Sequence, residues 1–343
     1  MDVNYKRKIL VTGAGGFIGF HLSKKLLELG FEVFGIDNLN AYYDVRLKLD
    51  RLKELGIDVQ SEFFMRQLEV KSQIYPEFRF AQLDLVEERQ LDSLFVKEQF
   101  DIVINLAAQA GVRYSIENPK VYIQSNVVGF INVLEACRQN NIKHLIYASS
   151  SSVYGNQKEV PFSENDRVDN PISLYAATKK SNELMAHVYS HLYALPTTGL
   201  RFFTVYGPWG RPDMAPFLFT KAIFEDKPLK VFNNGNLMRD FTYIDDIING
   251  IIGVVNSKVN PPEFRVLNIG NNSPVKLMDF IHEIEINCDK KAILEMHPMQ
   301  DGDVYQTFAD IDKLRMLCDY SPKTSIQTGL ASFVKWYKKY YEK

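Results

Sequence analysis

Three glycines at three-residue intervals follow a short apolar run near the beginning of the chain. The run is Lys8–Thr12 (KILVT), the glycines are Gly13, Gly16 and Gly19, and leucines at helical spacing continue to Gly30. Glycine permits the tight turn between strand and helix, lets a pyrophosphate approach the backbone, and lets the helix pack closely on a sheet. A simple tight turn is the alternative for such a triplet. In this order, the glycines predict a fold that begins with a dinucleotide-binding unit.

Further apolar runs of strand length recur along the first two thirds of the chain, separated by helical patterns. We expect these strands at residues 31–36, 78–83, 102–106, 145–148 and 198–203. Strands that are apolar on both faces and alternate with helices predict an α/β fold with a doubly wound parallel sheet of the Rossmann type. Residues 38–77 form a long insertion between the second and third strands, with a helix expected around residues 46–55.

The sequence pattern changes after Tyr206, because prolines and glycines often interrupt the apolar runs there. Such interruptions are typical of loops and short elements. We therefore expect a dinucleotide-binding domain at residues 1–205 and a smaller, loop-rich substrate lobe at residues 206–343 that is interleaved with it.

Composition excludes several classes of protein. Forty Lys and Arg against 42 Asp and Glu give a formal charge of −2, which removes the electrostatic argument for a nucleic-acid binder. Three widely spaced cysteines do not suggest a disulfide framework. The most apolar stretch, residues 247–255, is too short to cross a bilayer, and the first residues do not resemble a signal peptide. We expect a soluble, cytoplasmic protein with neither nucleic-acid nor membrane partners.

An acidic residue, Asp37, ends the second expected strand. A carboxylate there can bind the adenosine ribose diol and would repel the extra phosphate of NADP, so the cofactor is expected to be NAD. A helix cap or turn is the alternative for this residue. Asp84, after the third strand, is a weaker candidate for a contact with the edge of the adenine ring, because aspartate is also a common turn former.

A tyrosine and a lysine, Tyr175 and Lys179, stand four residues apart on an expected helix, and Ser150 ends an earlier strand. A free tyrosine titrates near pH 10, so its use as a base near neutrality needs a shift of about 3 pH units. A nearby ammonium and a nicotinamide cation both favour the phenolate. The trio suits proton transfer during hydride transfer at a carbinol carbon. Taken alone, the Tyr–Lys pair is more often an exposed helix face.

These motifs together resemble the extended short-chain dehydrogenase/reductase family of nucleotide-sugar epimerases. The resemblance rests on the glycine triplet, Asp37-Asn38, the run from Leu106 to Gln109, Ser150, and the Tyr175–Lys179 pair. A narrower similarity, to the family members that act on UDP-glucuronate, rests on residues 35–40, 110–115, 201–213 and 239–246.

The resemblance implies a set of contacts for each ligand. The catalytic residues would be Ser150, Tyr175 and Lys179. NAD would be contacted by Gly13, Gly16, Phe17, Ile18, Gly19, Asp37, Asn38, Asp84, Leu85, Leu106, Ala107, Ala108, Gln109, Asn126, Tyr175, Lys179 and Phe203. The UDP-sugar would be contacted by Arg113, Ser150, Ser151, Ser152, Tyr175, Thr204, Arg211, Phe232, Arg239 and Asp303. Within that set, Arg211 and Arg239 would grip the diphosphate or sugar, and Phe232 would pack on uracil. A structural ion pair at the surface is the alternative for each arginine.

Hydroxyl side chains indicate which UDP-sugar is the expected substrate. Related dehydratases and decarboxylases carry an acid where this chain has Ser152, so the acid that would protonate a leaving hydroxyl is missing. Ser151, Ser152 and Thr204 can instead donate hydrogen bonds to a sugar carboxylate. We expect 4-epimerisation of UDP-glucuronate to UDP-galacturonate, a precursor for polysaccharide synthesis, through a transient 4-keto sugar. The alternatives are a UDP-glucose or UDP-N-acetylhexosamine 4-epimerase and a non-catalytic NAD-binding sensor or scaffold.

Two further expectations concern metals and partners. His187 and His191 share a helical face, but no third ligand accompanies them, so no metal site is expected. The resemblance implies a homodimer that pairs through the helices near residues 121–140 and 175–193.

Overall fold

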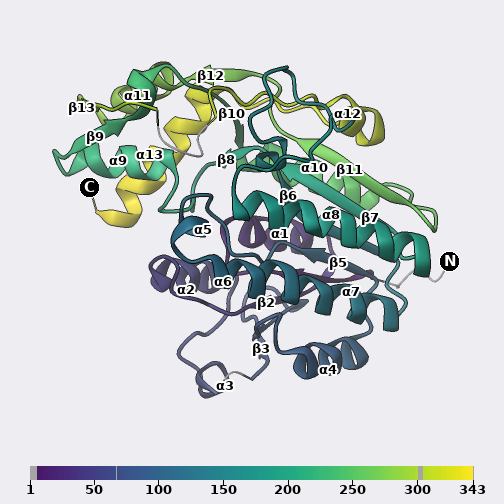
Figure 1. Ribbon diagram of the computed structural model, residues 1–343. Coiled ribbons are helices and arrows are strands. Elements are labelled where there is room, and N and C mark those ends of the chain that lie inside the picture. Colours follow the sequence, from purple (N-terminus) through teal and green to yellow (C-terminus); the bar gives the residue numbers. More distant parts are fainter. Residues whose placement is uncertain (1–5, 67, 300–303, 343) are drawn as a thin grey trace.

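The computed structural model describes residues 6–66, 68–299 and 304–342 (Figure 1). A large sheet lies between two layers of helices, and a smaller lobe packs at one end of it. The sheet has the strand order β11-β7-β6-β5-β1-β2-β4-β3 among the described residues. Its strands are β1 (Lys8–Thr12), β2 (Glu32–Asp37), β3 (Val70–Lys71), β4 (Phe78–Gln82), β5 (Ile102–Asn105), β6 (His144–Ser150), β7 (Thr197–Phe202) and β11 (Phe264–Ile269).

All neighbouring strands of this sheet run parallel except β3, which pairs antiparallel with β4. From β1 the chain builds outward through β2 and β4 on one side, then returns to build β5, β6 and β7 on the other. The order therefore reverses between β1 and β5. In doubly wound sheets, ligands bind outside the carboxyl ends of the strands at such a reversal.

Alternating side chains of the strands feed two separate apolar cores. In β1, Ile9 and Val11 face one core and Leu10 faces the other, and all three are fully buried. The first core packs against α1 (Phe17–Glu28), α2 (Val45–Glu54), α10 (Ile244–Asn256) and α12 (Asp312–Cys318). The second packs against α4 (Glu88–Glu98), α7 (Gly129–Gln139) and α8 (Leu174–Tyr193). Strands buried on both faces explain the unbroken apolar runs of the sequence.

The smaller lobe carries two short sheets with their own aromatic core. One sheet has the order β12-β10-β8 and the other pairs β13 with β9. The strands are β8 (Thr204–Tyr206), β9 (Pro228–Val231), β10 (Met238–Tyr243), β12 (Pro274–Lys276) and β13 (Ile293–Met296). Helices α9 (Ala215–Phe224), α11 (Leu277–Cys288) and α13 (Ile326–Tyr341) surround them, as the upper left of Figure 1 shows.

The remaining helical elements are short and lie in connections. They are α3 (Glu62–Met65), α5 (Tyr114–Glu117), α6 (Pro119–Tyr122), the π-helix η1 (Ile123–Val128), and the 3₁₀ turns η2 (Ser151–Tyr154) and η3 (Phe232–Gly235).

The expected fold class is confirmed, and each expected strand is present to within two residues at either end. The insertion after β2 contains the expected helix as α2. Two features were not anticipated. The helical pattern at residues 121–140 is divided into α6, η1 and α7, and β11 returns from beyond residue 206 to edge the large sheet.

Candidate active site

The glycine loop joins β1 to α1 and leaves no room for side chains. Gly13 has a φ of +72°, and a Cβ built there would lie 2.9 Å from the backbone nitrogen of Ala107. A Cβ on Gly19 would lie 2.1 Å from the carbonyl oxygen of Gly13. Gly16 caps α1 without a side-chain acceptor, so no side chain competes for the N–H groups of the first turn. Backbone and helix end together form an anion cradle suited to a pyrophosphate.

A cleft of about 440 Å³ extends from this loop along the carboxyl ends of the strands. Sixteen of the seventeen residues expected at the cofactor line it: Gly13, Gly16, Phe17, Ile18, Gly19, Asp37, Asn38, Asp84, Leu85, Leu106, Ala107, Ala108, Gln109, Tyr175, Lys179 and Phe203. The seventeenth, Asn126, lies behind the cleft wall. Its side chain accepts a hydrogen bond from the backbone N–H of Gln109 at 2.8 Å and donates one to the Gln109 carbonyl at 3.0 Å, and so holds the loop after β5.

Asp37 ends β2 and faces the glycine loop. A Cβ on Gly15 would lie 3.3 Å from its Oδ2. Its Oδ1 accepts a hydrogen bond from the Leu39 N–H at 2.8 Å and lies 3.4 Å from Nζ of Lys48, in a pair that is buried on both sides. Lys48 also lines the cleft but was not identified from the sequence, because it stands on α2, within the insertion, eleven residues along the chain.

A second carboxylate, Asp84, follows β4 and accepts a hydrogen bond from the Asn38 side chain at 2.8 Å. It therefore lies beside the loop that follows Asp37. A glycine cradle with a carboxylate at the end of the second strand fits the pyrophosphate and adenosine ribose of a dinucleotide.

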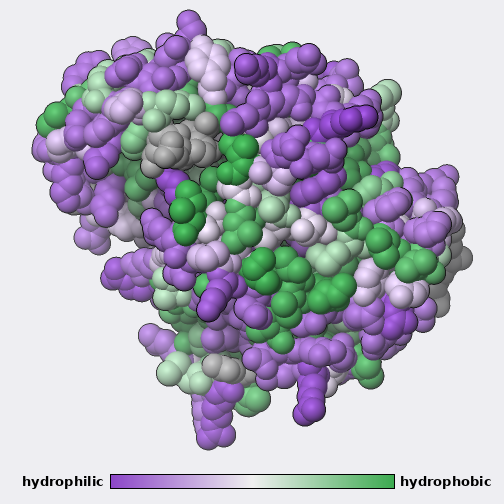
Figure 2. Space-filling view, in the orientation of Figure 1, coloured by the Kyte–Doolittle hydropathy of each residue, from purple (hydrophilic) through white to green (hydrophobic). Residues whose placement is uncertain are grey.

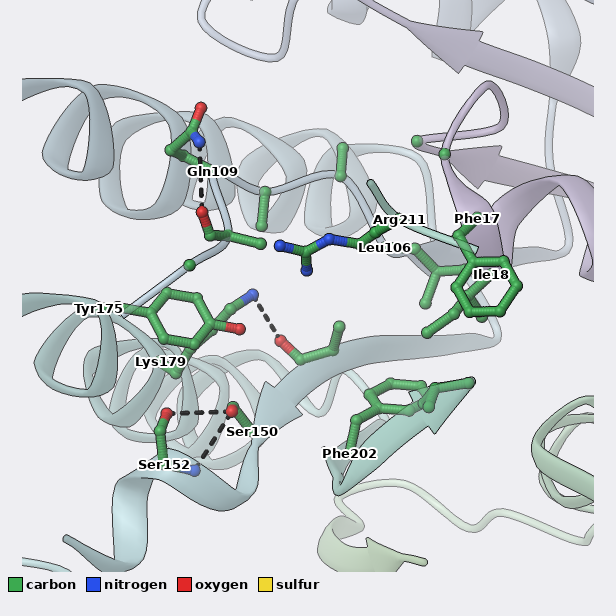
Figure 3. A pocket seen from close by; sticks show the side chains of 18 of the residues that line it. Phe17, Ile18, Leu106, Gln109, Ser150, Ser152, Tyr175, Lys179, Phe202 and Arg211 are labelled. Atoms are coloured by element: carbon green, nitrogen blue, oxygen red, sulfur yellow. Dashed lines mark hydrogen bonds between the residues drawn. The ribbon is translucent and has the colours of Figure 1, made fainter. Parts of the chain in front are cut away.

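The proton-transfer candidates meet at the middle of the cleft (Figure 3). Ser150 is the last residue of β6, and Tyr175 and Lys179 occupy the first turns of α8, whose N-terminus is capped by the Ser173 hydroxyl. Nζ of Lys179 lies 5.9 Å from the centre of the Tyr175 ring and donates a hydrogen bond to the Ala148 carbonyl at 2.8 Å. The spacing that the sequence placed on one helix face therefore brings both side chains to one site.

The hydrogen bonds that Ser150 accepts leave its own hydroxyl proton available for donation to another group. Its Oγ accepts hydrogen bonds from the N–H of Ser152 at 3.2 Å and from the Ser152 hydroxyl at 3.0 Å. A hydroxyl has two acceptor lone pairs and one proton to donate. With both lone pairs engaged, the Ser150 proton is directed to another acceptor, and its hydrogen bond with Tyr175 lowers the pKa of that phenol.

The protein by itself raises the pKa of Tyr175. Burial is the main cause, and the charge of Arg211 followed by the hydrogen bond of Ser150 opposes it. Burial also lowers the pKa of Lys179 to about 8. The Lys179 ammonium faces the Tyr175 ring, and its hydrogen bond goes to the Ala148 carbonyl. Arg211 is a second positive charge, which sequence reasoning had not placed beside the phenol, and its guanidinium projects into the same cleft (Figure 3).

The substrate candidates divide into two groups. Seven of the ten line the cleft: Ser150, Ser151, Ser152, Tyr175, Thr204, Arg211 and Arg239. Arg113 and Phe232 do not line it but face each other, with the guanidinium carbon 5.0 Å from the ring centre. Asp303 lies outside the described residues.

Two arginines reach this end of the cleft from different segments. Arg211 makes two hydrogen bonds with Asp213, at 3.0 and 2.5 Å, and retains about a quarter of its side-chain exposure. Arg239, on β10, donates to the carbonyls of Met238 at 2.9 Å and Tyr305 at 3.1 Å. Positive charge at this end suits a diphosphate, because the planar guanidinium can donate two parallel hydrogen bonds.

Sequence reasoning missed a pair of tyrosines on the cleft wall. Tyr42 and Tyr43 belong to the insertion after β2, and the Tyr42 hydroxyl donates a hydrogen bond to Asp213 at 2.9 Å. Thr307 also lines the cleft, and its hydroxyl accepts a hydrogen bond from the Asp240 N–H at 3.1 Å. The doubled tyrosine in a long insertion was a usable indication.

Neither a metal-binding cluster nor a membrane-spanning helix is present among the described residues. No group of three or more His, Cys, Asp or Glu side chains is arranged to hold a metal ion in this part of the chain. None of the helices built from residues 6–66, 68–299 and 304–342 is long and apolar enough to span a membrane.

Comparison with known proteins gives concordant matches along the chain. Residues 9–270 match the model of the NAD-dependent epimerase/dehydratase family. Protein CapI of Staphylococcus aureus is 52% identical over 98% of this chain and 100% of its own length. A probable UDP-glucuronate 4-epimerase of Rhizobium meliloti is 44% identical over 98% of both chains.

A solved structure resembles the fold described above. It is UDP-glucuronic acid 4-epimerase from Bacillus cereus in complex with UDP-glucuronic acid and NAD. That protein is 36% identical, with a TM-score of 0.87, over 97% of this chain and 100% of its own.

Proposed function

The chain belongs to the NAD-dependent epimerase/dehydratase family, and from that premise we propose that it is a UDP-glucuronate 4-epimerase, which interconverts UDP-glucuronate and UDP-galacturonate with NAD as cofactor. The observation that carries the proposal is one continuous cleft that joins the glycine loop, the Ser150–Tyr175–Lys179 trio and a hydroxyl-rich, arginine-flanked end. The relatives named above support the choice of sugar.

NAD would lie with its pyrophosphate on the glycine loop and its adenosine ribose at Asp37. When bound, it supplies a site that accepts hydride from C4 of the sugar and returns it to the other face. The residues present fit this group, since the loop admits no Cβ and the carboxylate faces it. The cationic nicotinamide also favours the Tyr175 phenolate, which burial in the protein alone disfavours.

Tyr175 would take the proton of the sugar 4-hydroxyl and later return it. Ser150 donates a hydrogen bond that stabilises the phenolate, and Arg211 adds positive charge. Lys179 is assigned to orientation, because its bond to the Ala148 carbonyl ties α8 to the end of β6. The 4-keto sugar would turn while the diphosphate stays anchored by Arg211 and Arg239.

Ser151, Ser152 and Thr204 are assigned to the sugar carboxylate. All three line the cleft beside Ser150. The 4-keto uronate is a β-keto acid, which loses carbon dioxide readily, so an epimerase has to hold its carboxylate rigidly. Hydroxyl donors do this without the repulsion that a carboxylate side chain would add.

The uracil is assigned to the Arg113–Phe232 pair, just outside the cleft. A nucleobase needs a flat apolar or cationic face to stack on, and this pair offers both. Asp303 keeps its expected contact with the UDP-sugar as a prediction.

A homodimer is proposed on the same grounds. An apolar patch lies over the region of α6 to α8 (Figure 2). It includes five side chains that are between 38% and 60% exposed: Val121, Ile123, Leu184, Val188 and Leu192. Apolar surface grouped on helices marks an interface. Free cysteines among the described residues support a reducing, cytoplasmic location, and the product would serve as a sugar donor for polysaccharide synthesis.

The test is NMR of the purified protein with catalytic NAD, incubated separately with UDP-glucuronate, UDP-glucose and UDP-N-acetylglucosamine. We expect UDP-galacturonate from the first, without net NADH. The matched control is Tyr175→Phe, which should retain NAD and lose about 10³-fold in kcat, as removal of a general acid–base does. Activity on the neutral sugars alone would make the protein a UDP-glucose or UDP-N-acetylhexosamine 4-epimerase. Bound NAD without turnover of any sugar would leave a sensor or scaffold.

A further inference from the structure

Arg51, on α2, is a buried arginine outside the set of expected site residues. Its side chain is 0% exposed, and it is not in an ion pair with any carboxylate of the described residues. Burying a charge is costly unless hydrogen bonds compensate for the lost water. The partners of this guanidinium are instead backbone carbonyls of two loops that lie far apart in the sequence.

One edge of the guanidinium contacts the segments that line the proposed NAD site. Nη1 donates a hydrogen bond to the carbonyl of Gly15, inside the glycine loop, at 2.9 Å. It also donates to the Tyr43 hydroxyl at 2.7 Å. The positive charge therefore lies directly against the loop that is proposed to receive the NAD pyrophosphate.

The other edge contacts the loop that leads to Arg211. Nη2 donates hydrogen bonds to the carbonyls of Trp209 at 2.6 Å and Gly210 at 3.4 Å. Trp209 has a φ of +63°, in the left-handed region that bulky residues avoid. Surrounding contacts have to hold such a backbone in place, and Arg51 supplies two of them one and two residues before Arg211.

A second side chain, from the helix that follows the glycine loop, holds the loop before Arg211. His21, on α1, donates from Nε2 to the carbonyl of Pro208 at 2.9 Å. Burial lowers the pKa of His21 to about 4, so the ring is neutral near pH 7 and keeps one N–H for this bond. The carbonyls of Pro208, Trp209 and Gly210 are thus each held from the cofactor side of the molecule.

We propose that Arg51 is a positioning residue that couples the two binding sites: its guanidinium ties the glycine loop to the loop that aims Arg211 into the cleft. The proposal rests on the proposed function for the identity of the two ligands. Lysine cannot replace it, because a single ammonium is a point donor whereas the planar fork spans both loops. Order imposed on one loop then favours the other, which makes binding of the two ligands mutually supportive.

The experiment compares Arg51→Lys with two matched variants. Arg46→Lys is the control, since Arg46 is on the same helix, is exposed, and pairs with Asp44, two residues away. Arg211→Met removes the proposed UDP contact and the positive charge near Tyr175, but leaves every hydrogen bond of Arg51 in place. Isothermal titration calorimetry would give the dissociation constants of NAD, and of UDP at saturating NAD, for each protein.

We expect Arg51→Lys to weaken both NAD and UDP by about tenfold or more, while kcat at saturating ligands falls no further than in Arg211→Met, because Ser150, Tyr175 and Lys179 are untouched and only the placement of Arg211 changes. Arg211→Met should weaken UDP only, and Arg46→Lys should change neither by more than twofold. Hydrogen exchange of the peptide spanning residues 207–214 should become faster in Arg51→Lys and not in Arg46→Lys, with no ligand present.

Affinities of Arg51→Lys within twofold of wild type, even with a lower melting temperature, would show a purely structural role and overturn the proposal. Loss of NAD affinity alone would also overturn it. Wild-type protein that binds neither ligand would instead refute the proposed function, and the ligand role of Arg51 with it.

His21→Phe provides a second route if Arg51→Lys does not fold. Phenylalanine keeps the ring packing against Phe17 and Phe20 but removes the bond to Pro208. This variant should weaken UDP about fivefold, leave NAD unchanged and raise exchange in the same peptide. Unchanged exchange and UDP affinity would mean that these carbonyl contacts do not hold the Arg211 loop.

Discussion

The cofactor end and the substrate end of the cleft are built in different ways. The cofactor end comes from the ends of neighbouring strands and from one loop whose tight turn depends on contacts that are short in sequence, as when Gly19 meets Gly13. The substrate end is assembled from η2, β8, the loop before α9, and β10. A local motif can specify the first end by itself, whereas the second depends on how the lobe packs against the sheet.

The largest effect is expected from breaking the local motif. Gly19→Ala would place a methyl group 2.1 Å from the Gly13 carbonyl, so the loop has to shift. We expect NAD affinity to fall at least 100-fold, measured by the NAD retained on purification and by calorimetry.

The matched control for that variant is Gly30→Ala, where φ is +84° but no atom lies within 4 Å of the new Cβ. It should cost about 1 kcal/mol of stability and leave NAD affinity intact. Equal loss of NAD in both variants would mean that the glycine loop is no more demanding than an ordinary turn.

Lys179 lies where the two ends of the cleft meet, and its burial affects the free energy of unfolding. Burial lowers its pKa from 10.5 to about 8. Between these values the unfolded chain holds the proton and the folded chain does not, so the free energy of unfolding rises with pH through that interval and the penalty is full below pH 8. The penalty is about 3 kcal/mol at pH 7.

Lys179→Met should therefore raise the free energy of unfolding at pH 7 by about 2 kcal/mol, once the lost bond to Ala148 is subtracted, while activity is largely lost. Urea unfolding at pH 7 and pH 10 checks this, and the gain should shrink at pH 10. Lys180→Met, one residue along and paired with Glu183, should show no such gain. Destabilisation of Lys179→Met at both pH values would contradict the reasoning.

A smaller effect is expected on cofactor choice. Asp37→Ser removes the carboxylate that repels a 2′-phosphate and leaves Lys48 without its buried partner. The preference for NAD over NADP should fall about tenfold, measured as the ratio of the two dissociation constants. Asp84→Ser, which removes the carboxylate that accepts hydrogen bonds from the Asn38 side chain and the Val86 N–H, should leave the ratio unchanged. A shift in both variants would mean that net charge, and not the position of Asp37, sets the preference.

The smallest effect is expected at the substrate end, where several hydroxyls share one task. Ser152→Ala removes one donor and one bond to Ser150. The KM for UDP-glucuronate should rise severalfold and a UDP-pentose by-product should increase, both followed by NMR. Thr204→Val tests the neighbouring hydroxyl in the same way. If neither affinity nor by-product changes in either variant, the carboxylate is held elsewhere.

Most of the cofactor end could be predicted from the sequence because its causes are local. A φ near +72° at Gly13 and the absence of space at Gly19 restrict those positions to glycine. The acid at the end of β2, Asp37, is identified by its position in the next strand of the chain. Asn126 was also identified, but the structure has it hold the Gln109 backbone from behind the cleft. Residue type alone does not distinguish these two positions.

The substrate end was predicted in part. Ser151, Ser152 and Arg211 were found through motifs, while Tyr42 was missed, as was Lys48 at the cofactor end. The missed residues come from the insertion after β2, whose helix was expected but whose orientation was not. Orientation depends on long-range contacts such as the hydrogen bond from Tyr340 to Asp50, at 2.5 Å, which ties α13 to α2.

The sequence by itself determined the fold class, the cofactor end and the placement of Tyr175 and Lys179 on one helix face, since apolar period, glycine spacing and the four-residue helical repeat act over short stretches of chain. Only the tertiary structure decided that Arg211 adds a charge near Tyr175, that Lys179 bonds to a backbone carbonyl, and that Arg51 joins two loops. Electrostatic environment and burial depend on groups brought together from distant segments, and no local pattern encodes that proximity.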